Sequence, residues 1–335
     1  MKTFSNYMNS WLYDNDGYYA NYKIIGKEGD FFTSVSTTSF FGGTIAKKIV
    51  DSIEEKSLSK TCSIVEIGAH HGYLLADIIQ FIYTLKPALL NSLNFIIIEK
   101  FESLQKKQKS YLYESFGDAI NLTFYKDLSE VKLNEAFIVA NEIFDAFTCE
   151  LVYTKDNILH QAFVKENTIL FHPCKDKNIL NYCKKFNITK GEVALSYKSF
   201  IETLNKNIEK FIFITFDYGD NYARNDFSIR VYKNHKVYAF FDKSINVLQF
   251  YKNSDITYDV NFKYLIDIAH KLSLQTNFKT QAMALIDFGI VELLELLRKN
   301  VDENNYLKQT QKVKLLIEPT GMGDRFKMLE IRKLK

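Results

Sequence analysis

The residues best suited to chemistry in this chain are two glycines, Gly68 and Gly72, and a carboxylate, Glu99. Glu66 lies in the apolar run that stops at Gly68, and a second apolar run, residues 94–98, stops at Glu99. A glycine turn after one strand and a carboxylate after the next are typical of a nucleotide-binding βαβ unit, in which the carboxylate binds the ribose hydroxyls. The sequence therefore predicts a ligand that contains a nucleoside, and the glycines alone do not say which one.

The glycine turn carries His70 at its centre, where a dinucleotide-binding turn has a glycine that lets the backbone approach a pyrophosphate. It also lacks the lysine and hydroxyl residue of a phosphate-binding loop. Both features disfavour pyrophosphate and favour a nucleoside with a short amino-acid tail, which describes S-adenosylmethionine. Although His70 and His71 are adjacent, their side chains should diverge and no third ligand lies nearby in sequence, so we predict no metal site.

Two further acids, Glu142 and Asp145, follow the apolar run 136–141, which ends in Asn141. If Glu142 begins a helix, both carboxylates can project over the same crevice. Carboxylates bind the planar fork of a guanidinium bidentately, so the pair could orient an arginine side chain. The alternative is that both acids only stabilise the start of a helix through its dipole.

Polar groups thus follow four of the predicted strands, in chain order Gly68, Glu99, Asn141 with Glu142, and Asp217. The carboxyl ends of parallel strands border the ligand crevice in open α/β sheets. Any single polar residue at a strand end has an ordinary explanation in the turn that follows it. Four on one edge instead predict a functional crevice.

The elements that must position these residues alternate between strand and helix, which predicts an α/β fold with a doubly wound, mostly parallel Rossmann-like sheet. Strands are predicted at 62–67, 94–99, 121–125, 136–141, 211–217 and 326–331, and helices at 44–55, 73–85, 102–115, 261–273, 280–299 and 305–313. Shorter strands at 150–154, 158–164 and 167–171, helices at 178–186 and 196–208, and a hairpin of 228–233 and 236–240 turning at Asn234-His235 complete the prediction.

We predict four segments from this pattern. Residues 1–45 form an aromatic N-terminal cover, 46–150 the cofactor-binding half of the sheet, 151–210 an inserted α+β subdomain, and 211–335 the remainder. With 335 residues, 47% of them hydrophobic, the chain can bury a full core as one large domain with insertions or as two domains.

Charge and hydropathy narrow the partners and the location. The net charge of +3 is spread along the chain, which disfavours nucleic acid and anionic membrane surfaces as partners. No apolar run approaches the roughly 20 residues that span a bilayer, and the N-terminal residues lack the apolar segment of a signal peptide. The sequence therefore predicts a cytoplasmic protein that is not inserted in a membrane.

With these residues in view, the chain resembles the MidA-type family of S-adenosylmethionine-dependent methyltransferases, from about Tyr7 to Ile331. The matching pieces, in family order, are Tyr7-Met8, Leu12-Tyr13, Gly17-Tyr18-Tyr19, Gly29-Asp30-Phe31-Phe32-Thr33, Phe41-Gly42, Val65–Gly68 with Gly72, Leu74 and Asp77, Glu99 with Gln108, Ala140–Ala146, Asp217-Tyr218-Gly219, Asp255-Ile256-Thr257 with Val260 and Phe262, Thr280-Gln281 with Gly289, and Gly321–Lys327. Single motifs of this kind are weak, but their shared order along one chain is specific.

The resemblance implies a class I methyltransferase that acts on a protein, with arginine as the favoured acceptor and a respiratory-complex subunit as a possible substrate. The implied catalytic residues are Glu142, Asp145, Asp217 and Tyr218. The implied cofactor-binding residues are Glu66, Gly68, His70, Gly72, Glu99, Tyr125, Asp127 and Asn141, with Lys126 beside the adenine.

The chain departs from the family pattern at three places. Val35-Ser36 replaces a Pro-Glu pair, Thr38-Ser39 replaces a Ser-Pro pair, and His70 replaces a glycine. The first two departures support an alternative from another class, a non-catalytic assembly or scaffold protein that retains the fold. A small-molecule methyltransferase is a further alternative, which the large insertion disfavours because it suggests a macromolecular partner.

Overall fold

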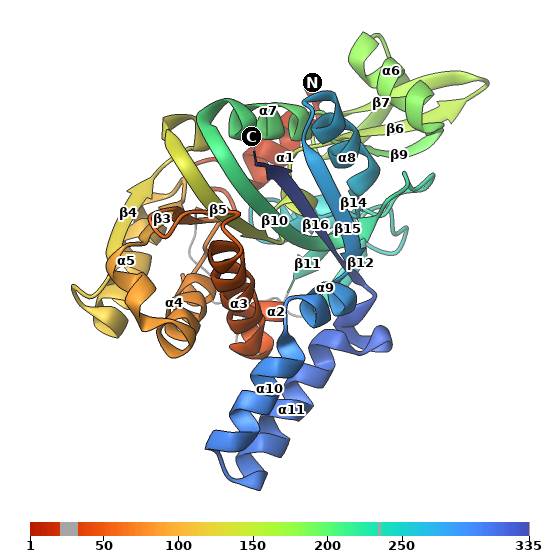
Figure 1. Ribbon diagram of the computed structural model, residues 1–335. Helices are drawn as coiled ribbons and strands as arrows, with labels where there is room; N and C mark the ends of the chain where they lie inside the picture. The colour runs from red at the N-terminus through yellow and green to blue at the C-terminus, as the bar shows by residue number, and fades with distance from the viewer. Residues whose placement is uncertain (21–32, 234–235, 335) are drawn as a thin grey trace. The chain divides into compact units, whose positions relative to one another are not determined.

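The structure is a computed structural model that describes residues 1–20, 33–233 and 236–334 (Figure 1). The chain forms two compact units. Unit 1 comprises Met1–Phe31, Glu142–Ile201 and Tyr218–Ile268, and unit 2 comprises Phe32–Asn141, Glu202–Asp217 and Ala269–Lys335. The predicted segments Gly29–Phe32 and Asn234-His235 lie outside the described residues.

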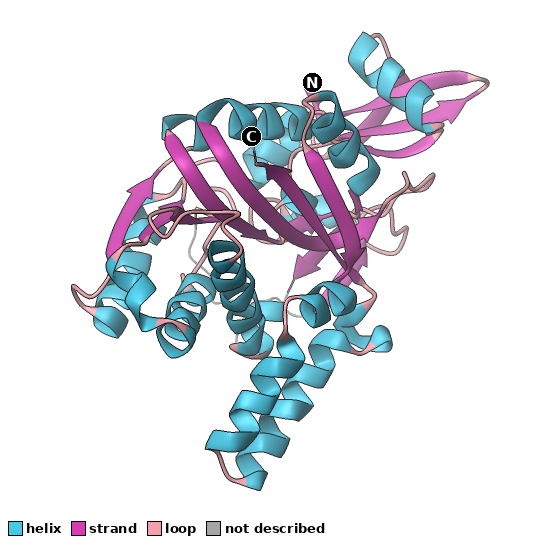
Figure 2. Cartoon of the chain, in the orientation of Figure 1, coloured by secondary structure: helices cyan, strands magenta, loops and turns pink. Residues whose placement is uncertain are grey.

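Unit 2 contains the large sheet of the molecule, drawn in magenta in Figure 2. Its spatial order is β4 (Asn121–Tyr125), β3 (Asn94–Ile98), β2 (Ser63–Ile67), β5 (Leu133–Asn141), β10 (Ile208–Asp220), β16 (Phe326–Lys333) and β15 (Gln275–Thr280). The first five strands pair in parallel, whereas β15 and β16 are antiparallel to each other. The predicted α/β fold with a mostly parallel sheet is confirmed.

The central parallel strands form because their residues are mostly apolar on both faces, as expected for strands covered on both sides. Every residue of β2 is buried, and so are five consecutive residues of β5, Ala136–Ala140. Counted in chain order, the first five strands lie in the order 3-2-1-4-5 of a doubly wound sheet, with the chain reversing direction across the sheet beside β2. This reversal is where such sheets bind their ligands.

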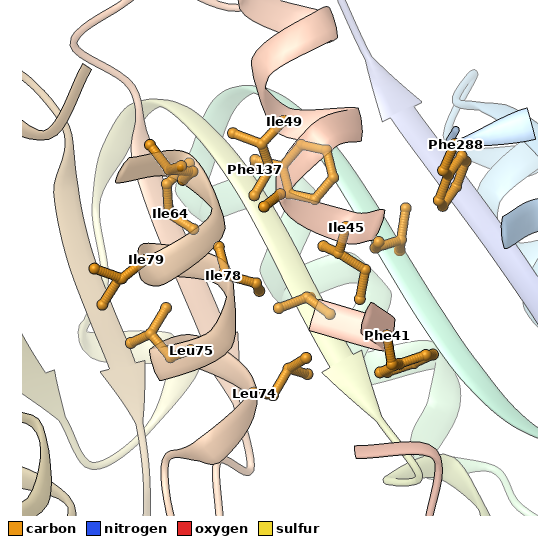
Figure 3. Close-up of a cluster of buried hydrophobic side chains, with 14 of the residues drawn as sticks. Phe41, Ile45, Ile49, Ile64, Leu74, Leu75, Ile78, Ile79, Phe137 and Phe288 are labelled. Carbon is orange, nitrogen blue, oxygen red and sulfur yellow. The ribbon is translucent and has the colours of Figure 1, made fainter. Parts of the chain in front are cut away.

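Helices of unit 2 cover one face of this sheet and build its main core (Figure 3). The helices and helical turns of unit 2 are α2 (Ser34–Thr37), α3 (Phe40–Glu54), α4 (Tyr73–Leu85), η1 (Pro87–Asn91), α5 (Glu102–Phe116), η2 (Leu128–Glu130), α9 (Gln281–Asp287), α10 (Ile290–Asn300), α11 (Glu303–Ile317) and η5 (Pro319–Gly323). Phe41 and Ile45 of α3 pack with Leu75 of α4 against strand residues such as Phe137. Burying each such side chain contributes about 1.5–3 kcal/mol to folding.

Unit 1 holds the N-terminal residues and the inserted segment. Its elements are β1 (Lys2–Thr3), α1 (Phe4–Leu12), η3 (Phe144–Ala146), β6 (Glu150–Lys155), β7 (Ile158–Lys165), β8 (Thr168–Pro173), α6 (Lys177–Phe186), β9 (Lys190–Val193), β11 (Arg230–Lys233), β12 (Lys236–Ala239), η4 (Val247–Phe250), β13 (Asp255–Thr257) and β14 (Val260–Asn261). Two helices, α7 (Ser196–Asn207) and α8 (Phe262–Lys271), run from one unit into the other.

Two antiparallel sheets and an aromatic cluster organise unit 1. β8, β7, β6 and β9 form one sheet with β1 at its edge, and β12, β11 and β13 form the other. The aromatic N-terminal residues pack within this unit: Tyr7 stacks on Tyr251 at 4.8 Å, and the Trp11 indole donates to the Ser254 carbonyl oxygen at 2.7 Å.

Two elements near the C-terminus differ from the sequence prediction. The prediction missed β15, because Gln275–Thr280 is a polar, partly exposed edge strand without an apolar run. The predicted helix 280–299 is two helices, α9 and α10. Gly289 lies between them, and its left-handed φ of 91° interrupts the helical backbone. Over the described residues, no helix is long and apolar enough to cross a membrane.

Candidate functional site

The glycine turn between β2 and α4 depends on left-handed backbone at three positions. Gly68 has φ 73°, His70 φ 45° and Gly72 φ 81°. Glycine adopts this region at no steric cost, whereas a residue with a β-carbon does not. The Gly68 N–H donates to the Ile98 carbonyl oxygen of β3 at 3.1 Å, which holds the turn against the neighbouring strand.

Glu66 ties this turn to the helix that follows it. Its side chain is buried, and its Oε2 accepts a hydrogen bond from the Leu75 N–H of α4 at 3.1 Å. Burial raises the pKa of Glu66 to about 8, and the Leu75 hydrogen bond opposes that rise. Glu66 therefore holds a proton near neutral pH, and its predicted contact with the cofactor stays a prediction.

Glu99 lies directly after β3, and hydrogen-bond donors from the backbone and from Gln108 hold its carboxylate. Oε1 accepts from the Phe101 N–H at 3.1 Å, and Oε2 accepts from the Gln108 side-chain amide at 3.3 Å. The side chain is buried, which raises the pKa of Glu99, and both hydrogen bonds act against that rise. The carboxylate is thereby fixed in orientation at the end of its strand.

The register of the parallel strands brings four of the predicted residues to one edge of the sheet. Ile67 lies beside both Ile98 and Ala140, so Gly68, Glu99 and Asn141 leave neighbouring strands at the same level. Asn141 in turn lies beside Phe216, which precedes Asp217. This common edge could not be fixed by sequence alone, because it depends on strand order and register.

Tyr125 and Asp127 lie at the outer strand of the same sheet. The Tyr125 carbonyl oxygen accepts from the Glu99 N–H at 2.9 Å. The Asp127 carboxylate caps η2 by accepting from the Ser129 N–H at 2.8 Å, while Lys126 pairs with Glu102 at 2.6 Å. Asp127 thus has a local structural role, and the predicted adenine contacts stay predictions.

The acids after β5 do not have the geometry that a helix start would give them. Glu142 has a left-handed φ of 52°, and only the short turn η3 (Phe144–Ala146) follows. The expectation that Glu142 begins a helix is wrong, because its left-handed backbone is not helical and the helical turn starts only at Phe144. Asp145 is buried within η3, and its carbonyl oxygen accepts from the Tyr258 N–H at 3.2 Å.

Arg230 of unit 1 places its guanidinium near the segment that holds Asp145. Arg230 Nη1 pairs with Asp259 Oδ1 at 2.6 Å, and the guanidinium lies 5.3 Å from the centre of the Tyr218 ring. Burial raises the pKa of Asp145, whereas the positive charge of Arg230 lowers it. Asp259 and Tyr218 therefore contact an arginine of this chain, whose positive charge also acts on Asp145.

Sequence reasoning gave no role to two residues here: Gln108, which it named only as part of the family match, and Arg230, which it did not name. Gln108 could have been found because it occupies the middle of a buried stripe, Leu104-Gln108-Leu112, in a polar helix. Arg230 lies between two apolar residues, Ile229 and Val231, where a charge needs a buried partner.

The residues of the glycine turn and of Glu99 fit S-adenosyl-L-methionine. A buried carboxylate at the end of the second strand suits two ribose hydroxyls. No lysine or arginine lies between Gly68 and Leu85, so the turn offers no fixed cation to a pyrophosphate. The donor set therefore suits a nucleoside with an amino-acid tail.

The fold and this edge of the sheet are those of an α/β protein suited to a nucleoside-containing ligand. A family model described as "Putative S-adenosyl-L-methionine-dependent methyltransferase" matches residues 44–280, and the chain belongs to this family. It is thus an S-adenosyl-L-methionine-dependent methyltransferase, and the predicted family and cofactor are confirmed.

Curated relatives match nearly the whole chain. The rat and human proteins, each named "Protein arginine methyltransferase NDUFAF7, mitochondrial", are 24% identical to it over 92% of this chain, and the matches cover 76% and 75% of their own lengths. The Drosophila melanogaster homologue is 22% identical over 93% of this chain and 77% of its own length. These mitochondrial names contradict the predicted cytoplasmic location.

Solved structures show the same fold. A crystal structure of a Burkholderia thailandensis protein bound to S-adenosyl-homocysteine has a TM-score of 0.83, with 20% identity over 99% of this chain and 88% of the other. A native crystal structure of an uncharacterized Burkholderia thailandensis protein has a TM-score of 0.81, with 19% identity over 99% of this chain and 87% of the other.

Proposed function

We propose that this methyltransferase transfers the methyl group of S-adenosyl-L-methionine to an arginine side chain of a protein. The observation that carries the proposal is the name shared by the curated relatives, protein arginine methyltransferase, over 92% of this chain. The carboxylate of Glu142, one residue beyond the sheet edge at Asn141, supports it chemically because carboxylates bind guanidinium groups.

Positioning and electrostatics supply most of the rate in such a transfer. S-adenosyl-L-methionine supplies an electrophilic methyl group on a sulfonium. In the proposed roles, Glu99 binds the ribose hydroxyls and the glycine turn holds the amino-acid tail. Asp217 and Tyr218 border the channel through which the acceptor enters.

Of the two acids after β5, we assign the acceptor guanidinium to Glu142. Asp145 is buried and already feels the charge of Arg230, so its carboxylate serves the packing of unit 1. In this role Glu142 would accept hydrogen bonds from two guanidinium nitrogens and leave the third nitrogen toward the methyl group. S-adenosyl-L-methionine would supply that methyl group, with S-adenosyl-homocysteine as the leaving group once the carbon–sulfur bond breaks. The proton released on transfer passes to solvent.

The test incubates the protein with tritiated S-adenosyl-L-methionine and a lysate that includes respiratory complexes. A labelled protein band that yields methylarginine on hydrolysis supports the proposal, and a respiratory-complex subunit is the candidate substrate that the family resemblance implies. Label in a small molecule would indicate a small-molecule methyltransferase. Cofactor binding without transfer to any acceptor would favour a non-catalytic assembly or scaffold protein.

Glu142→Gln and Asp145→Asn separate the two acids. We expect Glu142→Gln to leave cofactor affinity unchanged and to slow single-turnover transfer about a hundredfold, because a charged acceptor loses its bidentate partner. Asp145→Asn should instead change the thermal midpoint more than the transfer rate. Equal transfer rates in wild type and Glu142→Gln would remove Glu142 from the catalytic residues.

A further inference from the structure

Gln108 lies in α5 at a position where the helix pattern calls for an apolar side chain. The buried residues of this polar helix are Leu104, Gln108 and Leu112, spaced at i, i+4 and i+8 along one stripe. Gln108 is fully buried between the two leucines. A buried amide costs free energy unless its groups are hydrogen-bonded. Apolar packing alone therefore does not explain a glutamine at this position.

The side-chain amide of Gln108 joins two separate parts of the cofactor edge. Its Nε2 donates to the His70 carbonyl oxygen of the glycine turn at 2.8 Å and to Oε2 of Glu99 at 3.3 Å. The two N–H bonds of one amide thus hold the turn after β2 and the carboxylate after β3. Because both donors belong to one planar group, the amide fixes the two acceptors in orientation relative to each other.

The stem of the same side chain borders the space beside Gly72. A β-carbon added to Gly72 would lie 3.8 Å from both Cβ and Cγ of Gln108. Gln108 therefore bonds to the centre of the turn at His70 and lies next to its end at Gly72. Its Oε1 is buried with no hydrogen-bond partner in the described parts of the chain, so the amide is held by its donors alone.

We propose that Gln108 is a positioning residue for the cofactor, which sets the distance between the glycine turn and the Glu99 carboxylate so that the two ends of S-adenosyl-L-methionine bind together. The proposal rests on the proposed roles of the turn and of Glu99. A ligand that spans two fixed points gains affinity when their separation is preset, since less ordering is needed on binding. Gln108 would act through these groups without touching the ligand.

The hydrogen bond from Gln108 also affects the ionisation of Glu99. Burial raises the pKa of Glu99 and this hydrogen bond lowers it, so loss of the hydrogen bond should raise that pKa further. Glu66 of β2 couples electrostatically to Glu99. Other titratable groups nearby are Glu66, His70 and His71. Every variant below retains them, so they contribute equally to the pH dependence of each variant.

The experiment measures the affinity of the full chain for S-adenosyl-homocysteine, the stable demethylated product, by calorimetry between pH 5.5 and 8.5. Gln108→Met keeps the length of the side chain and removes both donors. Gln105→Met is the matched control: it lies on the same helix, and Gln105 Nε2 donates at 2.6 Å to the backbone oxygen of Glu99, not to its carboxylate. Gln108→Glu restores a polar group that can donate only when it is protonated.

We expect Gln108→Met to weaken binding by about ten- to thirtyfold at pH 7.5, and further as the pH falls, because Glu99 then takes up a proton at a higher pH than in wild type. Gln108→Glu should show the opposite trend and bind more tightly as the pH falls, because a shared proton restores one donor and removes the repulsion between two carboxylates. Gln105→Met should follow the wild-type pH profile.

Equal affinity and equal pH profiles for wild type, Gln108→Met and Gln105→Met would overturn the proposal while leaving the methyltransferase function intact. A uniform loss in both Gln108 variants without opposite pH trends would also overturn it, since that is the signature of a disturbed helix. If Gln108→Met does not fold, the pH trend of Gln108→Glu alone decides. Lack of binding by wild type would instead refute the cofactor roles themselves.

Discussion

Glu99 is the residue on which the cofactor assignment depends most. Its carboxylate is oriented by the Phe101 N–H and by Gln108 before any ligand binds. Replacing it with alanine removes charge-assisted hydrogen bonds worth roughly 1.5–3 kcal/mol each. We therefore expect Glu99→Ala to weaken the binding of S-adenosyl-L-methionine by about ten- to a hundredfold in a calorimetric titration. Glu99→Gln is the control that keeps the size of the side chain. Unchanged affinity in both variants would show that Glu99 does not bind the ribose.

His70 departs from the family glycine, and the backbone explains how it is accommodated. Its left-handed φ of 45° costs a residue with a β-carbon roughly 1–2 kcal/mol relative to glycine. Its carbonyl oxygen, which any residue would provide, receives the Gln108 hydrogen bond. We predict that His70→Gly folds normally and holds or modestly improves cofactor affinity in a thermal-shift titration. A clear loss of affinity would show that the imidazole itself contacts the cofactor.

At the scale of elements, the pairing of β10 with β14 depends on Gly219. Gly219 has φ 137°, and a β-carbon there would overlap the backbone of Val260, its pairing partner. Backbone atoms cannot move aside as a flexible side chain can. We predict that Gly219→Ala lowers the thermal midpoint by many degrees or prevents folding.

Gly117 provides the matched control for this prediction. It also has a positive φ, 56°, but a β-carbon there would meet nothing within 4 Å. Gly117→Ala should therefore cost only the strain of its backbone conformation, φ 56° and ψ −134°, roughly 1–3 kcal/mol in chemical denaturation. Equal destabilisation by the two substitutions would contradict the role of close backbone approach at Gly219.

At the scale of the whole molecule, several buried carboxyl groups link stability to pH. Burial raises the pKa of Glu66 to about 8, and those of Asp77 and Glu192 to about 7. Between the ordinary values near 4 and these raised values, the folded state holds protons that the unfolded state has released. Stability should therefore fall as the pH rises from about 5 to about 8, by at most about 1.4 kcal/mol per pH unit for each group.

Thermal midpoints measured at pH 5.5 and pH 8.5 check this prediction, and the lower pH should give the higher midpoint. Glu66→Gln should flatten the dependence, because it removes one titrating group while an amide oxygen can still accept from the Leu75 N–H. A thermal midpoint that rises from pH 5.5 to pH 8.5 would show that other titratable groups dominate the dependence of stability on pH.

The sequence by itself determined the elements that lie in the core and the order of the motifs. Apolar runs such as 94–98 predict strands because both of their faces are buried, and the boundaries of α4 match the prediction, Tyr73–Leu85. The same pattern missed β15, whose polar edge residues carry no apolar run. Local periodicity reports burial, so elements with little burial leave little signal.

Only the tertiary structure decided which polar residues meet. Register places Gly68, Glu99 and Asn141 at one edge, and it could not be read from the spacing of the strands along the chain. The electrostatic interaction of Arg230 with Asp145 joins segments about 85 residues apart in sequence. The residues of a short segment determine its own preference for helix or strand. Contacts between distant segments form only when the chain packs, so the local sequence pattern does not reveal them.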